Sequence, residues 1–260
     1  MTGYKNKTIK QHLNKRVTAW LSTLPIKLRE KIPVDVLVCG GAIGSMLLGD
    51  EPNDYDIYFK RQPSCRLVMD HYFSMHPIIA LSEGLRFDGR PHILHQKDVK
   101  FVSENAISLK DNIQLISRFV GKPREIFSNY DFIHTNLAYN YFKDELILHP
   151  MALQSLMSKT LIYSGSKYPL ASILRIRKFV ERGWTISVGQ ILKITLQLNK
   201  LDLSDPIVLS EQLLGVDSQY TEQLINKLCN LTTGDIEPEV LDELIDNIFD
   251  ENLKLNVLKY

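Results

Sequence analysis

The apolar residues before Pro25 recur three or four positions apart, as they do on one face of an α-helix. Six positions make this pattern: Ile9, Leu13, Val17, Trp20, Leu21 and Leu24. Basic residues occupy many of the positions between them. We therefore expect residues 1–33 to form a basic amphipathic helical element that packs on one side of a sheet.

Apolar runs in the middle of the chain predict strands rather than helices. We expect strands at 34–39, 54–59, 99–102 and 112–119, and helices at 64–76 and from about 123. After Pro150 the strand signal largely disappears, and helical patterns follow at 151–162, 169–183, 187–198, 218–231 and 238–250. The predicted fold class is therefore α/β (α+β), with a mixed-sheet head domain over 34–150 and an all-helical domain over 151–260.

A glycine pair follows the first predicted strand. Gly40 and Gly41 permit backbone conformations and close approaches that a β-carbon would block. The stretch after them has a helical pattern, and the free N–H groups at its start would face a triphosphate. An ordinary tight turn is the alternative interpretation.

Two aspartates begin the second predicted strand, which reads DYDIYF. Side chains alternate along a strand, so Asp54 and Asp56 project from one face while Tyr55 and Ile57 project from the other. Carboxylate oxygens suit Mg²⁺, and paired ions can stabilise the attacking and leaving oxygens of an in-line phosphoryl transfer. Taken alone, the pair is equally typical of a solvated strand end.

The order and spacing of these residues carry a family resemblance. The stretch 36–59 resembles the nucleotidyltransferase signature of the DNA polymerase β superfamily, most closely that of bacterial poly(A) polymerases and CCA-adding enzymes. Eight residues fit their pattern, GGxVRDxLLGxxPxDxDhx: Gly40, Gly41, Leu47, Leu48, Gly49, Pro52, Asp54 and Asp56. The resemblance implies a nucleotidyltransferase head domain in which Asp54 and Asp56 are catalytic and hold Mg²⁺ or Mn²⁺, and in which Gly40 and Gly41 orient the NTP.

Residues 130–140, YDFIHTNLAYN, are similar to the segment RDFTINALAYN of the same enzymes. In that family the segment helps to hold the incoming nucleotide, which implies contacts from Asp131 and Asn136. His134 lies three residues after Asp131 and has two interpretations. It either forms a hydrogen bond with phosphate or ribose, or is an interior histidine with its own partners.

Residues 169–184, PLASILRIRKFVERGW, are a weaker match to a helix of these enzymes. The resemblance implies that Arg175 and Lys178 contact the triphosphate or an RNA backbone. The alternative is a solvated basic face of a helix, which is the commoner role of such residues.

Several departures from the family pattern limit what it implies. The base-reading side chains of CCA-adding enzymes should open the helix at 169–184, but the chain has Lys167 and Tyr168, then Ala171 or Ser172. A standard CCA-adding enzyme is therefore not expected. The chain also resembles a group of uncharacterised phage-encoded nucleotidyltransferase-like proteins, which would explain the systematic departures. This resemblance rests on the combination of NAISL, IQLI, a tyrosine-preceded DF-x-H, IYSGSKYP and RKFVERGW.

Two departures fall within the site itself. Gly44 and Ser45 stand where the relatives have Arg-Asp, so the Ser45 hydroxyl becomes a candidate phosphate contact. Gln114 stands where many relatives have a third carboxylate. Either Glu104 or Asp131 completes the metal site, or two carboxylates suffice with waters, or catalysis is weakened.

Composition limits the choice of partners. The 260 residues include 31 basic and 30 acidic ones, so any RNA-binding face must be a local patch. The three cysteines, Cys39, Cys65 and Cys229, lie far apart and indicate reduced thiols in a cytoplasm, the host's if the chain is phage-encoded. The sequence has neither a signal-peptide pattern nor an apolar run of about 18 residues, so no membrane partner is expected.

These observations lead to one main functional hypothesis and two alternatives. The main hypothesis is an Mg²⁺-dependent enzyme that transfers a nucleoside monophosphate from an NTP such as ATP to an acceptor hydroxyl, most simply a tRNA-like RNA 3′ end. The first alternative is AMP transfer to a protein or small molecule. The second is an inactive nucleotide-binding or interaction module. The sequence leaves the oligomeric state open.

Overall fold

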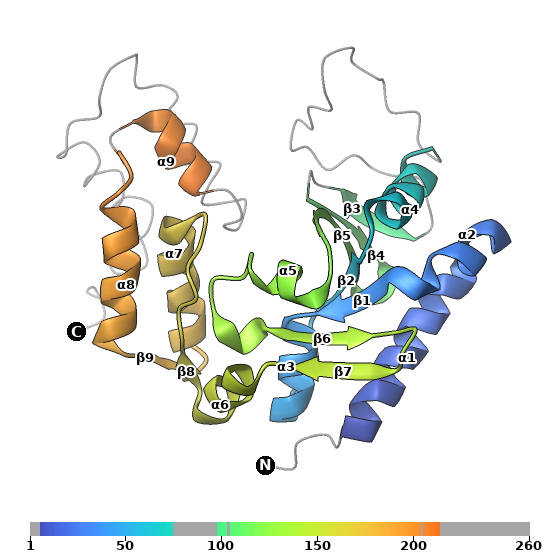
Figure 1. The fold of residues 1–260 in the computed structure, drawn as a ribbon, viewed down its shortest axis with the longest axis horizontal. Helices are drawn as coiled ribbons and strands as arrows, with labels where there is room; N and C mark the ends of the chain where they lie inside the picture. Colours follow the sequence, from blue (N-terminus) through green and yellow to red (C-terminus); the bar gives the residue numbers. More distant parts are fainter. Residues whose placement is uncertain (1–5, 75–97, 103–104, 204, 214–260) are drawn as a thin grey trace, which may run out of the picture. The chain divides into compact units, whose positions relative to one another are not determined.

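The computed structural model describes residues 6–74, 98–102, 105–203 and 205–213. The chain forms two compact units, Met1–Ile162 and Tyr163–Tyr260, which are coloured along the sequence in Figure 1. The predicted helices at 218–231 and 238–250, as well as Glu104, lie outside the described residues.

A mixed sheet forms the centre of the first unit (Figure 1). Its seven described strands are β1 (Val36–Cys39), β2 (Tyr55–Phe59), β3 (Val99–Val102), β4 (Ala106–Leu109), β5 (Ile113–Val120), β6 (Leu137–Asn140) and β7 (Glu145–Leu148). Their order is β3-β4-β5-β2-β1-β6-β7, and β2 pairs with β5 in parallel while the other described pairs are antiparallel. The predicted α/β class is confirmed, as are the strands predicted at 54–59, 99–102 and 112–119.

Six described helices belong to this unit. They are α1 (Asn6–Thr23), α2 (Ile26–Lys31), α3 (Gly41–Leu48), α4 (Gln62–Ser74), α5 (Pro123–Phe127) and α6 (Pro150–Ser158). Three 3₁₀ turns, Pro33–Asp35, Lys110–Asn112 and Ile133–Thr135, and the short β8 (Thr160–Leu161) complete it. The helix predicted at 151–162 ends earlier than expected, because Lys159 takes a left-handed conformation that terminates α6.

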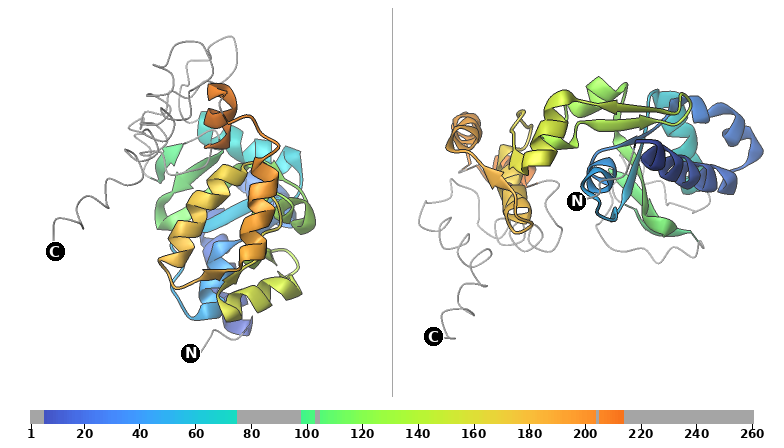
Figure 2. Two further views of the ribbon diagram at one scale, coloured as in Figure 1. Left: turned by 90° about the vertical axis from the view of Figure 1, so that its left-hand side faces the viewer. Right: turned by 90° about the horizontal axis from the view of Figure 1, so that it is seen from below.

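The two faces of the sheet are covered differently. On one face, Trp20 of α1 meets Phe59 of β2 edge to face at 6.4 Å. Figure 2 shows α1 and α3 on the same side of β6 and β7. On the other face, Ile126 of α5 joins a buried cluster formed by Leu37, Cys39, Tyr58 and Ala138. Asp56 lies on this second face, since it is two residues from Tyr58 in β2.

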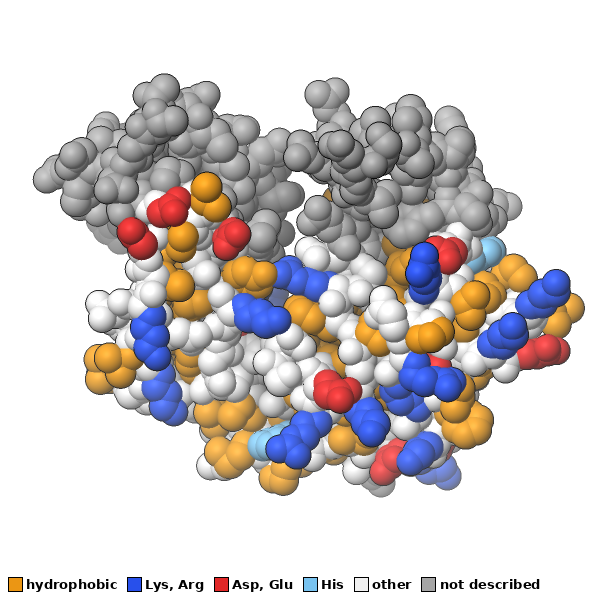
Figure 3. Space-filling model, turned by 45° about the horizontal axis from the view of Figure 1, so that its top comes forward, with side chains coloured by type: hydrophobic (Ala, Val, Ile, Leu, Met, Phe, Trp, Pro, Cys, Tyr) orange, Lys and Arg blue, Asp and Glu red, His pale blue; other side chains and the backbone are white. Residues whose placement is uncertain are grey.

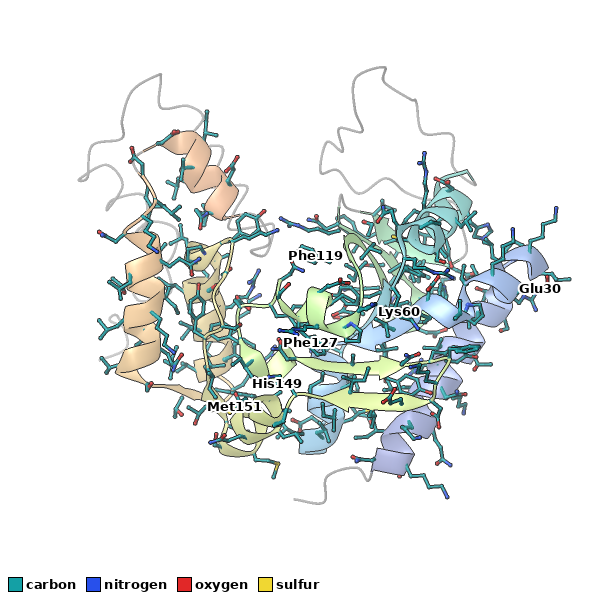
Figure 4. All side chains as sticks on the ribbon, in the orientation of Figure 1. Glu30, Lys60, Phe119, Phe127, His149 and Met151 are labelled. Atoms are coloured by element: carbon teal, nitrogen blue, oxygen red, sulfur yellow. The ribbon has the colours of Figure 1, made fainter. Side chains whose placement is uncertain are left out.

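Aromatic side chains border the buried cluster of the second face. Phe119 of β5 and Phe127 of α5, both labelled in Figure 4, are partly buried against it. Tyr130 follows α5, and its ring lies 6.2 Å from that of Phe127 and 6.4 Å from that of Tyr58. These contacts place the loop after α5 on the second face of the sheet, beside β2.

The second unit contains α7 (Pro169–Val180), β9 (Thr185–Ile186), α8 (Val188–Leu198) and α9 (Pro206–Gln212). The helices predicted at 169–183 and 187–198 are confirmed. Within this unit the Tyr163 hydroxyl donates to Gln197 Oε1 of α8 at 2.7 Å. No helix in the described part of the chain is long and apolar enough to cross a membrane.

Candidate nucleotide and metal site

The turn between β1 and α3 requires glycine at its first position. Gly40 has φ of 82°, a conformation that L-residues with a side chain rarely adopt. A Cβ atom there would lie 3.5 Å from the Tyr130 hydroxyl and 4.0 Å from Asp56 Oδ2. At Gly41, by contrast, an added Cβ meets nothing within 4 Å. The missing side chain of Gly40 therefore leaves open a small space beside the Asp56 carboxylate.

Helix α3 begins at this turn. The first N–H groups of a helix have no partner within it, so they favour an anionic ligand such as phosphate. Ser45, a predicted phosphate contact, lies one turn into α3 and is partly buried. At Gly44, which is buried, an added Cβ would lie 3.4 Å from Leu156 of α6 and 3.7 Å from Leu137, so this position faces the packed interior.

The two predicted metal ligands lie together at the start of β2. Asp54 immediately precedes the strand and is exposed, whereas Asp56 is partly buried within it. Burial, and secondly the negative charge of Asp54, raise the pKa of the Asp56 carboxyl to about 7. The two carboxylates are therefore close enough to repel each other, and a cation bound between them would relieve this repulsion.

The donor atoms suit a hard divalent cation. Carboxylate oxygens are the preferred ligands of Mg²⁺ and Mn²⁺. The described part of the chain contains no group of three His, Cys, Asp or Glu side chains that could hold a metal ion. Asp131 therefore does not join Asp54 and Asp56 as a third acidic ligand.

The segment after α5 contributes a buried amide close to the glycine turn. Asn136 is 8% exposed, and among the described residues its Oδ1 atom has no hydrogen-bond partner. Its backbone carbonyl accepts a hydrogen bond from the N–H of His149, which also caps α6 (Figure 4). The next carbonyl, that of Leu137, accepts from the N–H of Gly40 at 2.9 Å. A buried oxygen without a partner is unfavourable, so Asn136 is a candidate ligand contact.

His134 and Asp131 occupy different environments in the same segment. The His134 side chain is 5% exposed, and burial lowers its pKa to about 4, an effect that Asp131 opposes. The ring is therefore neutral near pH 7, which fits the interior interpretation better than a charged contact to phosphate. Asp131 lies in the turn before the 3₁₀ segment Ile133–Thr135 and is partly exposed.

Tyr55 lies between the two aspartates, and the sequence does not indicate which residues it contacts. Tyr55 is 3% exposed, its hydroxyl lies 2.6 Å from Nε2 of His12 in α1, and the Arg16 guanidinium lies 5.1 Å from its ring centre. These contacts fix the start of β2 to α1, and hence the backbone that carries Asp54 and Asp56. The alternation of the strand indicates only that Tyr55 faces away from the aspartates, not what it meets.

The remaining predicted residues belong to the second unit. Arg175 and Lys178 lie on α7, where Arg175 is partly buried and Lys178 exposed. Ala171 and Ser172, at the start of the same helix, are both 0% exposed. The Ser172 hydroxyl donates to the carbonyl of Tyr168 at 3.3 Å, so neither position presents a polar group that can read a base.

Basic side chains are dispersed over the described surface. On the face of the molecule shown in Figure 3, Lys and Arg side chains are scattered among apolar and acidic ones. This distribution agrees with the nearly balanced charge of the sequence.

Comparison with known proteins gives a family and several structural neighbours. Residues 11–159 match the model of a family described as Gad2, Gabija anti-defense 2 family protein. A relative from Bacillus phage SPbetaL7, named Gabija anti-defense 2, is 22% identical over 223 residues, which are 84% of this chain and 50% of that protein. The chain thus spans about half the length of this curated relative.

Among solved structures, a CCA-adding enzyme in complex with CTP has a TM-score of 0.48 at 14% identity, covering 93% of this chain and 67% of that one. A tRNA-processing enzyme with CTP has a TM-score of 0.45 at 15% identity, covering 87% and 62%. The Thermotoga maritima CCA-adding enzyme with tRNA has a TM-score of 0.41 at 14% identity, covering 90% and 56%. The predicted similarity to phage-encoded proteins is confirmed by the family match and the phage relative.

Proposed function

The chain belongs to the Gabija anti-defense 2 family, and from this premise we propose that it is a nucleotidyltransferase dependent on Mg²⁺ or Mn²⁺. It transfers a nucleoside monophosphate from an NTP to an acceptor hydroxyl. One observation carries the proposal. The Asp56 carboxylate, which is repelled by Asp54, lies beside the space that Gly40 leaves open at the start of α3. A cation site thus adjoins a phosphate-binding turn.

Asp54 and Asp56 hold the divalent cation in this proposal. When bound, such a cation neutralises charge on the triphosphate and on the attacking oxygen, which is the usual contribution of metals to phosphoryl transfer. The chain's own contribution is to hold the two carboxylates on a rigid strand. Tyr55 supports this through its contact with His12 on the opposite face of the sheet.

The turn and the segment 130–140 position the nucleotide. The N–H groups at the start of α3 bind phosphate oxygens, and Gly40 allows them to approach the backbone closely. Ser45 and Asp131 provide further polar contacts. Asn136 Oδ1, for which the described residues supply no partner, accepts a hydrogen bond from a nucleotide hydroxyl or amino group. The acceptor oxygen then bonds to the α-phosphorus as the bond to the β-phosphate breaks, so that pyrophosphate leaves and the acceptor loses its proton to solvent.

The first candidate acceptor is the 3′ end of an RNA. Arg175 and Lys178 on α7 support it, because basic side chains on the equivalent helix are what the resemblance to RNA-modifying enzymes implies. The second candidate is transfer of AMP to a protein. It is favoured by the buried Ala171 and Ser172 and by the net charge of +1, since a protein acceptor needs neither a base reader nor a polycationic face.

The name of the phage relative supplies a biological context for either acceptor. That protein is called Gabija anti-defense 2, and we extend the role stated in its name to this chain as part of the proposal. The modified molecule would then belong to the host's Gabija defence or act on it. Nucleotide transfer would change the charge and shape of that molecule at one hydroxyl.

The test is incubation of the purified chain with each α-labelled NTP, Mg²⁺ or Mn²⁺, and host RNA and protein extract. The Asp54→Ala/Asp56→Ala variant removes the cation ligands, and Asp70→Ala, an exposed aspartate of α4, is the matched control. We expect label from the wild-type chain and the control but not from the double variant. RNase and protease digestion then assign the acceptor. Absence of label under every condition would overturn the proposal in favour of a binding module.

A further inference from the structure

Asp56 has one neighbour on each side across the sheet. In β1 its register partner is Cys39, and in β5 it is Gln114. Residues opposite each other on adjacent strands project from the same face. Cys39, Asp56 and Gln114 therefore form a row, which Ser108 of β4 extends by one strand.

Only one of the two neighbours can bind the same cation as Asp56. Cys39 is 0% exposed, and a buried thiol is a soft and protonated sulfur that does not suit Mg²⁺. Gln114 is partly exposed, and the oxygen of a side-chain amide is a hard ligand. The described residues offer no third acidic, His or Cys ligand that would compete for this position.

We propose that the amide oxygen of Gln114 is the third side-chain ligand of the cation held by Asp54 and Asp56. This rests on the proposed function, which assigns the cation to those two aspartates. An amide adds a ligand atom but no charge, so the three side chains carry two negative charges instead of three. The site consequently binds a free divalent cation weakly. It binds the cation more tightly together with the nucleotide, because the phosphates add the negative charge and the ligand oxygens that the three side chains lack.

The pairing of β2, β5 and β4 allows an experiment with a closely matched control. Gln114→Glu adds a carboxylate next to Asp56, whereas Ser108→Glu adds the same charge to the same face one strand farther away, at a spacing of about 4.8 Å. Binding of Mn²⁺ alone, and of Mn²⁺ with a non-hydrolysable ATP analogue, is measured by calorimetry and by electron paramagnetic resonance. Both methods measure Mn²⁺ binding directly and need no catalytic turnover.

We expect Gln114→Glu to tighten binding of Mn²⁺ alone about tenfold or more and Ser108→Glu to change it less than about threefold. Gln114→Ala should weaken binding of Mn²⁺ with the analogue about fivefold or more. Equal effects of the two glutamates, or wild-type binding by both Gln114 variants, would overturn the proposal. If Gln114→Glu does not fold, Gln114→Ala and the shorter amide of Gln114→Asn decide the question, since wild-type binding by both excludes an amide ligand.

Failure of this assignment can be separated from failure of the proposed function. If the Asp54→Ala/Asp56→Ala variant loses Mn²⁺ and the Gln114 variants keep it, the cation site stands and only Gln114 is excluded. If the double variant binds Mn²⁺ and the analogue as the wild-type chain does, the site itself is wrong.

Discussion

The turn at Gly40 in the first unit and the start of α7 in the second differ in the groups that they present. Around Gly40 the chain has two carboxylates, the start of α3 and a buried amide oxygen that has no hydrogen-bond partner among the described residues. At the start of α7, Ala171 and Ser172 are fully buried. The first region has groups suited to phosphate and cation chemistry, whereas these two positions of the second lack groups suited to choosing a base. This contrast teaches that the groups suited to phosphate and cation binding gather at the Gly40 turn and are not matched at these two positions of α7.

The largest effect is expected from a substitution in the proposed cation site of the first unit. Asp56→Asn keeps the shape of the side chain but removes a negative ligand, so nucleotide transfer should fall about a thousandfold or more. Single-turnover assays with labelled NTP measure the rate, and Asp70→Asn serves as the exposed control. A variant that retains a rate within about tenfold of the wild-type chain would remove Asp56 from the mechanism.

The same carboxylate should make stability depend on pH when divalent cations are absent. The pKa of Asp56 is about 7 in the folded chain and about 3.9 in the unfolded one, so the folded state binds the proton more tightly between these values. Its stabilising contribution is therefore present at low pH and is lost as the pH rises through 7, by up to about 4 kcal/mol in all. Urea unfolding from pH 5 to 8 should show a smaller decline for Asp56→Asn than for the wild-type chain; identical slopes would contradict the assignment.

Adjacent glycines allow a sharper test of the turn. Gly40→Ala places a Cβ at a positive φ and fills the space beside Asp56, so we expect a loss of about 1–2 kcal/mol in stability and about tenfold weaker nucleotide binding. Gly41→Ala, whose Cβ meets nothing within 4 Å, is the control. Thermal unfolding and titration with an ATP analogue measure both effects. Equal losses in the two variants would indicate that the phosphate site does not depend on Gly40.

Asn136, directly before β6, and Asn140, the last residue of β6, allow a role in nucleotide binding to be distinguished from a role in stability. Asn136→Leu removes a buried oxygen that has no partner within the described part of the chain, so stability should be unchanged or rise by about 1 kcal/mol while nucleotide binding weakens several-fold. Asn140→Leu instead removes an acceptor used by Lys60 and by the N–H of Lys143, so it should lower stability without changing nucleotide affinity. The opposite pattern would make Asn136 a purely structural residue.

The smallest effect is expected in the choice of nucleotide. Because Ala171 and Ser172 present no polar group, kcat/KM for the four NTPs should agree within about threefold when each is tested separately. A preference above about a hundredfold would mean that another part of the chain reads the base by hydrogen bonds. The comparison between the two regions would then no longer hold.

Much of the fold follows from local patterns that the sequence displays directly. The spacing of Ile9, Leu13 and Val17 predicts α1, and all three residues are buried there. By contrast, β4, β6 and β7 escaped prediction, although β1 and β3 are equally short, because these three strands depend on pairing with their neighbours rather than on a local pattern. Likewise, the sequence places Ala171 and Ser172 near the start of a predicted helix, but it does not record their complete burial.

For the site, the sequence by itself determined the chemical groups and their local geometry. The glycines at 40 and 41 and the alternation that places Asp54 and Asp56 on one face follow from covalent structure and strand periodicity. Tertiary structure alone decided what lies around them. Gln114 lies opposite Asp56 because β5 pairs in parallel with β2. Asn136 lies near the glycine turn because β6 pairs with β1 and the carbonyl of Leu137, the next residue, accepts from the N–H of Gly40. The physical reason is that strand register between distant segments is set by the packing of the whole sheet, which no local pattern records.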